Sequence, residues 1–154
     1  MEDLELVVKK TSELSSKELL NIMQERVKVF VVEQNCPYQE IDTEDENAIH
    51  VELKRAGKLV AYTRIIPHED QKHISFGRVL VVKPYRKLKL GRKIVKATLD
   101  QIKKQYPTKD IKIQAQSYLQ EFYSSFGFKA VSGVYLEDNI PHLDMVLKIT
   151  EWLA

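Results

Sequence analysis

The stretch VLVVKPYRKLKLGRKIVKATL, residues 79–99, decides the fold prediction for this chain of 154 residues. Its first four residues are continuously apolar, which predicts a strand over 74–82 that is buried on both faces and ends where Pro84 stands. A basic turn follows, and from Arg92 apolar residues recur at helical spacing until Pro107. The stretch therefore predicts a buried strand, a basic turn and a crossover helix over 92–106.

The basic turn is a candidate anion site. A helix N-terminus leaves backbone N–H groups unpaired and carries the positive end of the helix dipole, so phosphate can bind there. Gly91 lets a ligand approach the backbone, and Arg86 supplies positive charge nearby. The alternative is a solvated basic start of a helix. No GxxxxGKS, GxxxxGKT or GxGxxG pattern occurs, which excludes a P-loop and a Rossmann dinucleotide site.

The segments before this stretch predict a strand, a helix and a hairpin. Alternating apolar residues indicate a strand at 4–8, and SSKE at 15–18 has the spacing of a capping box that begins a helix over 15–31. Residues 34–47 are predicted as a loop. Two strands, 48–53 and 59–66, then form a hairpin around the Ala56-Gly57 turn.

The segments after the stretch continue the alternation of strands and helices. A strand is predicted at 111–116, a helix at 118–126 that ends at Gly127, and two strands at 128–135 and 142–149. The chain is thus expected to form one α/β (α+β) domain over 1–154, a mixed sheet of about seven strands flanked by three to four helices.

Composition excludes several classes of protein. The 24 Lys and Arg residues nearly balance the 22 Asp and Glu residues, so a nucleic-acid-binding domain is a weak alternative. No apolar run reaches the roughly 18 residues of a membrane span, and the acidic N-terminus does not resemble a signal peptide. A single cysteine, Cys36, cannot close an intramolecular disulfide. We therefore expect a cytoplasmic protein with neither a nucleic acid nor a membrane as partner.

Two motifs resemble the acetyl-CoA-binding segments of the GNAT superfamily of N-acetyltransferases. Arg86 and Gly91, after Val82-Lys83-Pro84, match its (R/Q)xxGx(G/A) loop, with Lys89 at the first glycine position. QSYLQEFYSSFGF at 116–128 is similar to its NxxAxxFYxxxGF segment. VFVVEQNCPYQEID at 29–42, FGRVLV at 76–81 and IPH at 140–142 resemble the ElaA-like branch. The resemblance covers about residues 20–147 and implies a GNAT-like, mostly antiparallel sheet.

This resemblance implies acetyl-CoA as acyl donor and direct transfer of the acetyl group to a primary amine of a small-molecule or peptide acceptor. The pantetheine arm would pair with a strand main chain, and the phosphates would bind the basic turn. The implied cofactor-binding residues are Leu80, Val81, Val82, Arg86, Lys87, Leu88, Lys89, Leu90, Gly91, Arg92, Gln116, Phe122 and Tyr123. A non-catalytic acyl-CoA-binding or regulatory module on the same fold is the alternative.

The resemblance also implies a catalytic role for Tyr123, which would protonate the departing thiolate, whereas a merely packed aromatic ring is the alternative reading. The candidates for a general base are Glu33, His50, His142 and Asp144, each near a predicted strand or loop end.

The remaining polar residues support weaker expectations. The acidic residues at 40–46 either attract a cationic acceptor or form solvated surface. Cys36 has no Cys/His pairing that supports a covalent mechanism, and the scattered His residues lack metal-ligand spacing, so no metal is expected. The protein is expected to be a monomer or a homodimer.

Overall fold

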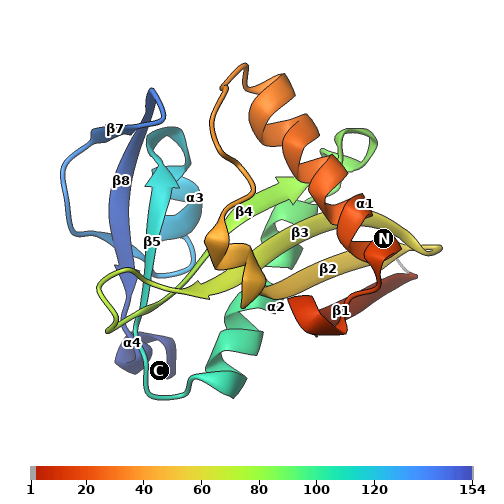
Figure 1. The fold of residues 1–154 in the computed structure, drawn as a ribbon. Coiled ribbons are helices and arrows are strands. Elements are labelled where there is room, and N and C mark those ends of the chain that lie inside the picture. Colours follow the sequence, from red (N-terminus) through yellow and green to blue (C-terminus); the bar gives the residue numbers. More distant parts are fainter. Residues whose placement is uncertain (1–2, 154) are drawn as a thin grey trace.

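The computed structural model describes residues 3–153, which form one mixed sheet of eight strands together with four α-helices (Figure 1). The strands are β1 (Leu4–Lys10), β2 (Ile49–Arg55), β3 (Lys58–Pro67), β4 (Ile74–Val81), β5 (Ile111–Gln116), β6 (Lys129–Ala130), β7 (Tyr135–Glu137) and β8 (Ile140–Leu147). The helices are α1 (Ser16–Val27), α2 (Leu90–Gln105), α3 (Gln120–Ser124) and α4 (Ile149–Leu153).

The sheet has the order β1-β2-β3-β4-β5-β8-β6, and β7 also pairs with β8. Every pair is antiparallel except β4 with β5, which run parallel. The predicted mixed, mostly antiparallel sheet with flanking helices is therefore confirmed. Within residues 3–153, no helix is long and apolar enough to cross a membrane.

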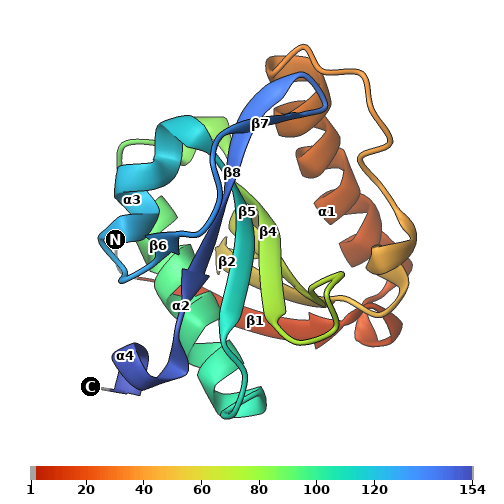
Figure 2. The same ribbon diagram turned by 90° about the vertical axis from the view of Figure 1, so that its left-hand side faces the viewer.

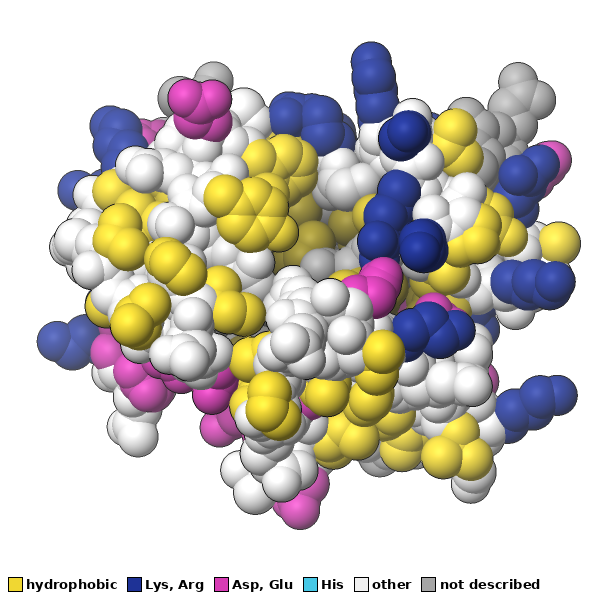
Figure 3. Space-filling model, turned by 90° about the horizontal axis from the view of Figure 1, so that it is seen from above, with side chains coloured by type: hydrophobic (Ala, Val, Ile, Leu, Met, Phe, Trp, Pro, Cys, Tyr) yellow, Lys and Arg dark blue, Asp and Glu magenta, His cyan; other side chains and the backbone are white. Residues whose placement is uncertain are grey.

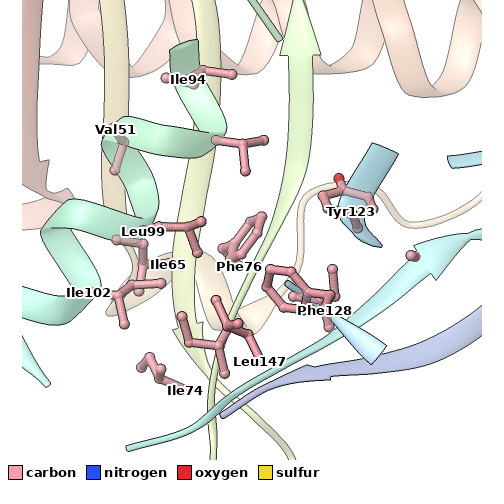
Figure 4. Close-up of a cluster of buried hydrophobic side chains, with 14 of the residues drawn as sticks. Val51, Ile65, Ile74, Phe76, Ile94, Leu99, Ile102, Tyr123, Phe128 and Leu147 are labelled. Atoms are coloured by element: carbon pink, nitrogen blue, oxygen red, sulfur yellow. The ribbon is translucent and has the colours of Figure 1, made fainter. Parts of the chain in front are cut away.

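Helices α1 and α2 cover opposite faces of the sheet (Figure 2), so β3 between them is buried on both faces. The amphipathic stripe of α2 packs on β2, β3 and β4 through Ile94, Val95, Leu99 and Ile102. Figure 4 shows this stripe meeting Phe76 and Leu147 from the sheet. Burial of such side chains at about 1.5–3 kcal/mol each holds the helix to the sheet.

The capping box at the start of α1 forms as the sequence predicts. The Glu18 N–H donates to Ser15 Oγ at 3.1 Å, and the Ser15 N–H donates to Glu18 Oε1 at 2.9 Å. The helix ends at Val27 and continues as a π-helix over Lys28–Glu33, rather than as regular α-helix to about residue 31. Residues 34–47 are mostly loop, and Thr43–Glu46 add one turn of 3₁₀-helix.

The C-terminal part differs from the prediction in two places. The strand predicted at 128–135 is divided into β6 and β7, because the Asp144 N–H donates to Ser132 Oγ (2.8 Å) in place of a main-chain partner. The last strand ends at Leu147 instead of 149, and α4 follows, with the Ile149 N–H bonded to the Asp110 carboxylate at 2.8 Å. These changes raise the strand number from about seven to eight within residues 3–153.

Strands β4 and β5 diverge along their length. They pair only at their first residues, Ile74 with Ile111, and separate beyond that point. A bulge adds to the distortion: Tyr62 pairs with Leu80 and Arg64 with Gly77, so two β4 residues face one β3 residue. The predicted burial of β4 on both faces is therefore wrong for Val79 and Val81, which are half-buried because they line the gap that β5 leaves.

Candidate active site

A cleft of about 1110 Å³ opens where β4 and β5 separate. From above, the molecule is hollowed near its centre, with hydrophobic side chains on one rim and Lys and Arg side chains on the other (Figure 3). The cleft is lined by β4, β5, the end of the π-helix, the 34–47 loop and the β7–β8 turn. Of the predicted site residues, it brings together Glu33, Leu80, Val81, Arg86, Gln116, Tyr123 and His142.

The main chain of Val81 faces the cleft. The Val82 N–H donates to Val60 O at 2.9 Å, so the main-chain polar groups of Val82 point toward β3. By alternation along the strand, those of Leu80 point the same way. The Val81 carbonyl instead accepts a hydrogen bond from Arg86 Nε at 2.9 Å. The implied pairing of a ligand with all of Leu80 to Val82 is therefore restricted to Val81, because the backbone of the other two is committed to β3.

A second cavity, of about 300 Å³, lies at the N-terminus of α2. Two residues of the turn before this helix have left-handed backbone conformations, Lys87 with φ 76° and Lys89 with φ 59°. No side chain caps the first turn of α2, so its N–H groups remain available to an anion, as in other concave backbone sites. The cavity is lined by Val81, Arg86, Lys87, Lys89, Leu90 and Gly91.

The residues of this cavity fit a diphosphate group. A Cβ built on Gly91 has no protein atom within 4 Å, so the fold itself does not require glycine there. The Leu90 side chain is buried in the core, which leaves only its backbone for a ligand. Lys89 occupies the left-handed position where the resembling motif has glycine, and it combines backbone strain of roughly 1–2 kcal/mol with a positive charge.

Four predicted cofactor residues, Val82, Leu88, Arg92 and Phe122, line neither this cavity nor the cleft. Arg92 turns toward α3, where Nη1 donates to Ser125 Oγ at 2.8 Å and the guanidinium lies 4.4 Å from the Phe126 ring centroid. Phe122 packs on the same guanidinium at 5.9 Å. Leu88 is exposed. Arg92 and Phe122 thus contact each other and pack α2 against α3.

Tyr123 lies against the cleft with a packed ring and an unpartnered hydroxyl. Its ring meets Phe122, Phe76 and Phe128 edge-on or tilted, at centroid distances of 5.1, 6.3 and 6.0 Å. Among the described residues, no protein group hydrogen-bonds its hydroxyl. Burial raises the pKa of Tyr123 above the ordinary phenol value, so the hydroxyl keeps its proton and acts as a donor.

His142 is the histidine of β8 that lines the cleft. Its Nδ1 lies 2.7 Å from Ile140 O, and since a carbonyl only accepts, Nδ1 carries a proton and Nε2 is the ring nitrogen that can accept one. The ring stacks on Tyr135, whose hydroxyl donates to the Asp144 carboxylate. His142 is therefore held in the tautomer that a general base requires.

The other candidate bases are placed differently. His50 is fully buried, with Nε2 2.7 Å from Thr11 Oγ1 and Nδ1 bonded to the Tyr62 hydroxyl, and burial lowers the pKa of His50 to about 4. Neither His50 nor Asp144 lines the cleft. The geometry does not support His50 as a base, because a neutral buried ring without access cannot meet an amine. Glu33 lines the cleft but is paired with Arg86, and the hydrogen bond from Arg86 lowers the pKa of Glu33.

A buried network of ion pairs fastens the 34–47 loop to the sheet and to α1. The fully buried Arg26 donates from Nε to the Glu40 carboxylate (3.0 and 3.2 Å) and from Nη1 and Nη2 to the Asp45 carboxylate (2.7 and 3.0 Å). Although burial raises it, the hydrogen bond from Arg26 brings the pKa of Asp45 down to about 2. The network comprises Arg26, Glu40, Asp42, Asp45, Arg64 and Arg78.

This network corrects the sequence interpretations for part of the acidic residues at 40–46. Glu40 and Asp45 are buried, and together with the partly exposed Asp42 they neutralise arginines of the protein, so these three carboxylates are not free to attract an acceptor. Glu44 and Glu46 are exposed, as the interpretation of solvated surface expects. Sequence reasoning missed the network because its partners lie 14 to 38 residues apart, without a spacing signal. Cys36 of the same loop is buried and free, and its Sγ donates to Asp138 O at 3.2 Å.

The site thus combines an anion-binding cavity at a helix start with a cleft between separating strands. Residues 14–149 match the model of the acetyltransferase (GNAT) domain family, and the chain belongs to this family. The chain is 42% identical over 144 residues to protein ElaA of Escherichia coli, which covers 91% of this chain and 94% of that protein. A UPF0039 protein of Schizosaccharomyces pombe is 44% identical over 151 residues, 97% of this chain and all of that protein.

Solved structures of acyltransferases and of ElaA are similar to this chain as well. The crystal structure of Escherichia coli ElaA has a TM-score of 0.88 at 40% identity, covering 94% of this chain and 99% of that chain. An acyl-CoA N-acyltransferase from Pseudomonas aeruginosa has a TM-score of 0.88 at 37% identity, covering 93% and 98%. An aminoglycoside 6'-N-acetyltransferase in complex with coenzyme A shares the fold at 14% identity, with a TM-score of 0.68 over 93% of this chain and 97% of that one. The fold thus supports transfer of acyl groups from coenzyme A.

Proposed function

We propose that the protein transfers an acetyl group from acetyl-CoA directly to a primary amine of a small-molecule or peptide acceptor. The observation that carries this proposal is that the two cavities adjoin. Val81 and Arg86 line both the cavity at the start of α2 and the cleft that contains Tyr123. A donor bound with its diphosphate at α2 can therefore direct its thioester toward Tyr123.

The proposed reaction is a direct displacement. The amine nitrogen attacks the thioester carbonyl carbon, the new C–N bond forms, and the C–S bond breaks with its electron pair on sulfur. Tyr123 donates its proton, or a hydrogen bond, to the departing sulfur. His142 accepts the proton that the attacking amine loses, through the lone pair on Nε2.

A base is needed most for a lysine-like acceptor. An amine with a pKa of about 10.4 is neutral about once in 2,500 molecules at pH 7, whereas an α-amine of pKa about 7.8 is neutral in more than one molecule in ten. We propose His142 before Glu33, because Glu33 is held by Arg86.

The test is release of free coenzyme A thiol from acetyl-CoA and from longer acyl-CoAs, with a panel of primary amines. We expect amine-dependent release that is fastest with acetyl-CoA and slowed in the variant His142→Gln. The cleft-lining but uninvolved Glu44→Gln is the matched control, because it changes a polar side chain of the same cleft. Coenzyme A binding without thiol release on any amine would support the alternative, a non-catalytic acyl-CoA-binding module.

We also propose that residues 1–154 form one such domain and that the protein works in the cytoplasm. The strands of the described residues all belong to one sheet, and the two hydrophobic clusters on it share strands β3 and β4, which supports the single domain. The free thiol of Cys36 supports a reducing compartment.

A further inference from the structure

The Arg86 side chain bridges one end of the cleft. Its Nη2 donates to both oxygens of the Glu33 carboxylate, at 2.7 and 3.1 Å, and its Nε donates to Val81 O at 2.9 Å. Glu33 ends the π-helix over Lys28–Glu33, and Val81 ends β4. The guanidinium thus ties the end of the π-helix to the edge of β4.

This position conflicts with the binding of an acyl donor. Val81 O belongs to the edge of β4 that β5 leaves unpaired, where an extended ligand chain adds as a further strand. A guanidinium binds phosphate bidentately through either its Nε edge or its Nη1–Nη2 edge. In this structure Nε is engaged by Val81 and Nη2 by Glu33, so each edge contains an engaged nitrogen.

Resting on the proposed function, we propose that the Arg86–Glu33 pair is a latch that acyl-CoA must open. Without donor, Glu33 holds Arg86 across the cleft and on Val81 O. When the donor binds, Arg86 exchanges both contacts for the diphosphate, Val81 O becomes free to pair with the donor arm, and the Glu33 carboxylate is left free in the cleft. Glu33 is a positioning residue in this scheme, because it acts through Arg86.

The strength of the pair suits such an exchange. The Arg86 and Glu33 side chains are 41% and 27% exposed, and ion pairs with this much solvent contact are weak. The ion pairs of Arg26 are fully buried and could not be exchanged in this way. A diphosphate offers the guanidinium more negative charge than one carboxylate does, so the exchange favours the donor.

The test measures the affinity of coenzyme A itself, which has no acyl group to turn over, by titration calorimetry. Four proteins are compared: the native chain, Glu33→Gln, Arg86→Ala and the double variant. We expect Glu33→Gln to tighten binding about 2- to 5-fold, because the competing contact is lost. Arg86→Ala should weaken binding, and in that background Glu33→Gln should have no effect. The control Glu44→Gln, which removes another carboxylate of the cleft lining, should leave the affinity unchanged.

Two results would overturn the latch. If Glu33→Gln tightened binding equally with and without Arg86, Glu33 would act by repelling the phosphates and not through Arg86. If Glu33→Gln left the affinity unchanged or weakened it, no competing contact would exist. Failure of the native protein to bind coenzyme A at all would instead refute the proposed function, and the latch with it.

Discussion

At the scale of single residues, the proposed chemistry depends on the Tyr123 hydroxyl, which is a proton donor in a packed aromatic setting. The change Tyr123→Phe keeps the ring volume and should leave the free energy of unfolding and the affinity for acetyl-CoA nearly unchanged. We expect the single-turnover rate at saturating acetyl-CoA to fall about 10- to 1,000-fold. Equal single-turnover rates in the two proteins would remove Tyr123 from the mechanism.

His50 shows how burial separates a structural histidine from a catalytic one. Its pKa is lowered to about 4 in the folded protein, against about 6.5 in the unfolded chain. Between these two values the unfolded state binds more protons, so His50 makes the protein less stable as the pH falls from 6.5 toward 4. The lost stability is roughly 3 kcal/mol.

The measurement for His50 is the free energy of unfolding at several pH values, in the native protein and in His50→Gln. We expect the difference between the two proteins to change most between pH 6.5 and 4.5, in the sense that the native protein loses more stability. The lowered pKa of Asp45, about 2, places its own effect below this window. Parallel pH profiles for the two proteins would show that His50 is not buried in its neutral form.

At the scale of elements, the start of α2 has a glycine, Gly91, at a position where the fold itself tolerates a larger residue, and we attribute this glycine to ligand binding. Gly91 has open space around it, so Gly91→Ala should leave the unliganded protein as stable or up to about 1 kcal/mol more stable. The same methyl group would stand where phosphate meets the backbone, so the affinity for acetyl-CoA should fall. Thermal unfolding with and without acetyl-CoA measures both effects. An unchanged affinity would contradict the phosphate position.

Helix α1 and the 34–47 loop form one unit through Arg26. Removal of this side chain in Arg26→Ala takes the fully buried partner from the Glu40 and Asp45 carboxylates and leaves them only Arg78 and Arg64, so we expect a loss of about 3–5 kcal/mol. The matched control is Lys96→Ala, which breaks the exposed pair with Asp100 and should cost less than about 1 kcal/mol. Denaturant unfolding measures both. Similar losses in the two variants would refute the structural role of the network.

At the scale of the whole molecule, the sequence predicted the elements better than their contacts. The strand, basic turn and helix around 79–99 were predictable because apolar period and helix-start chemistry are local signals. The divergence of β4 from β5 was not, because it depends on pairing between strands about 30 residues apart. The ion pair of Arg86 with Glu33 and the burial of Glu40 against Arg26 could not be predicted either, because the identity of a charged residue does not indicate its ion-pair partner. The sequence therefore predicted cavity-lining residues at the basic turn and at Tyr123, and two of the four candidate bases, Glu33 and His142, line the cleft; the roles of these residues stay predictions.

The divided sheet and the two cavities lead to one spatial claim: the diphosphate of the donor lies at the start of α2 and its sulfur lies beside Tyr123. A crystal structure of the protein with coenzyme A tests this claim most directly. We predict phosphate oxygens within hydrogen-bond distance of the backbone N–H groups at Gly91 and Arg92, and the sulfur within about 3.5 Å of the Tyr123 hydroxyl. Coenzyme A bound outside the cleft, or with its sulfur remote from Tyr123, would contradict the account.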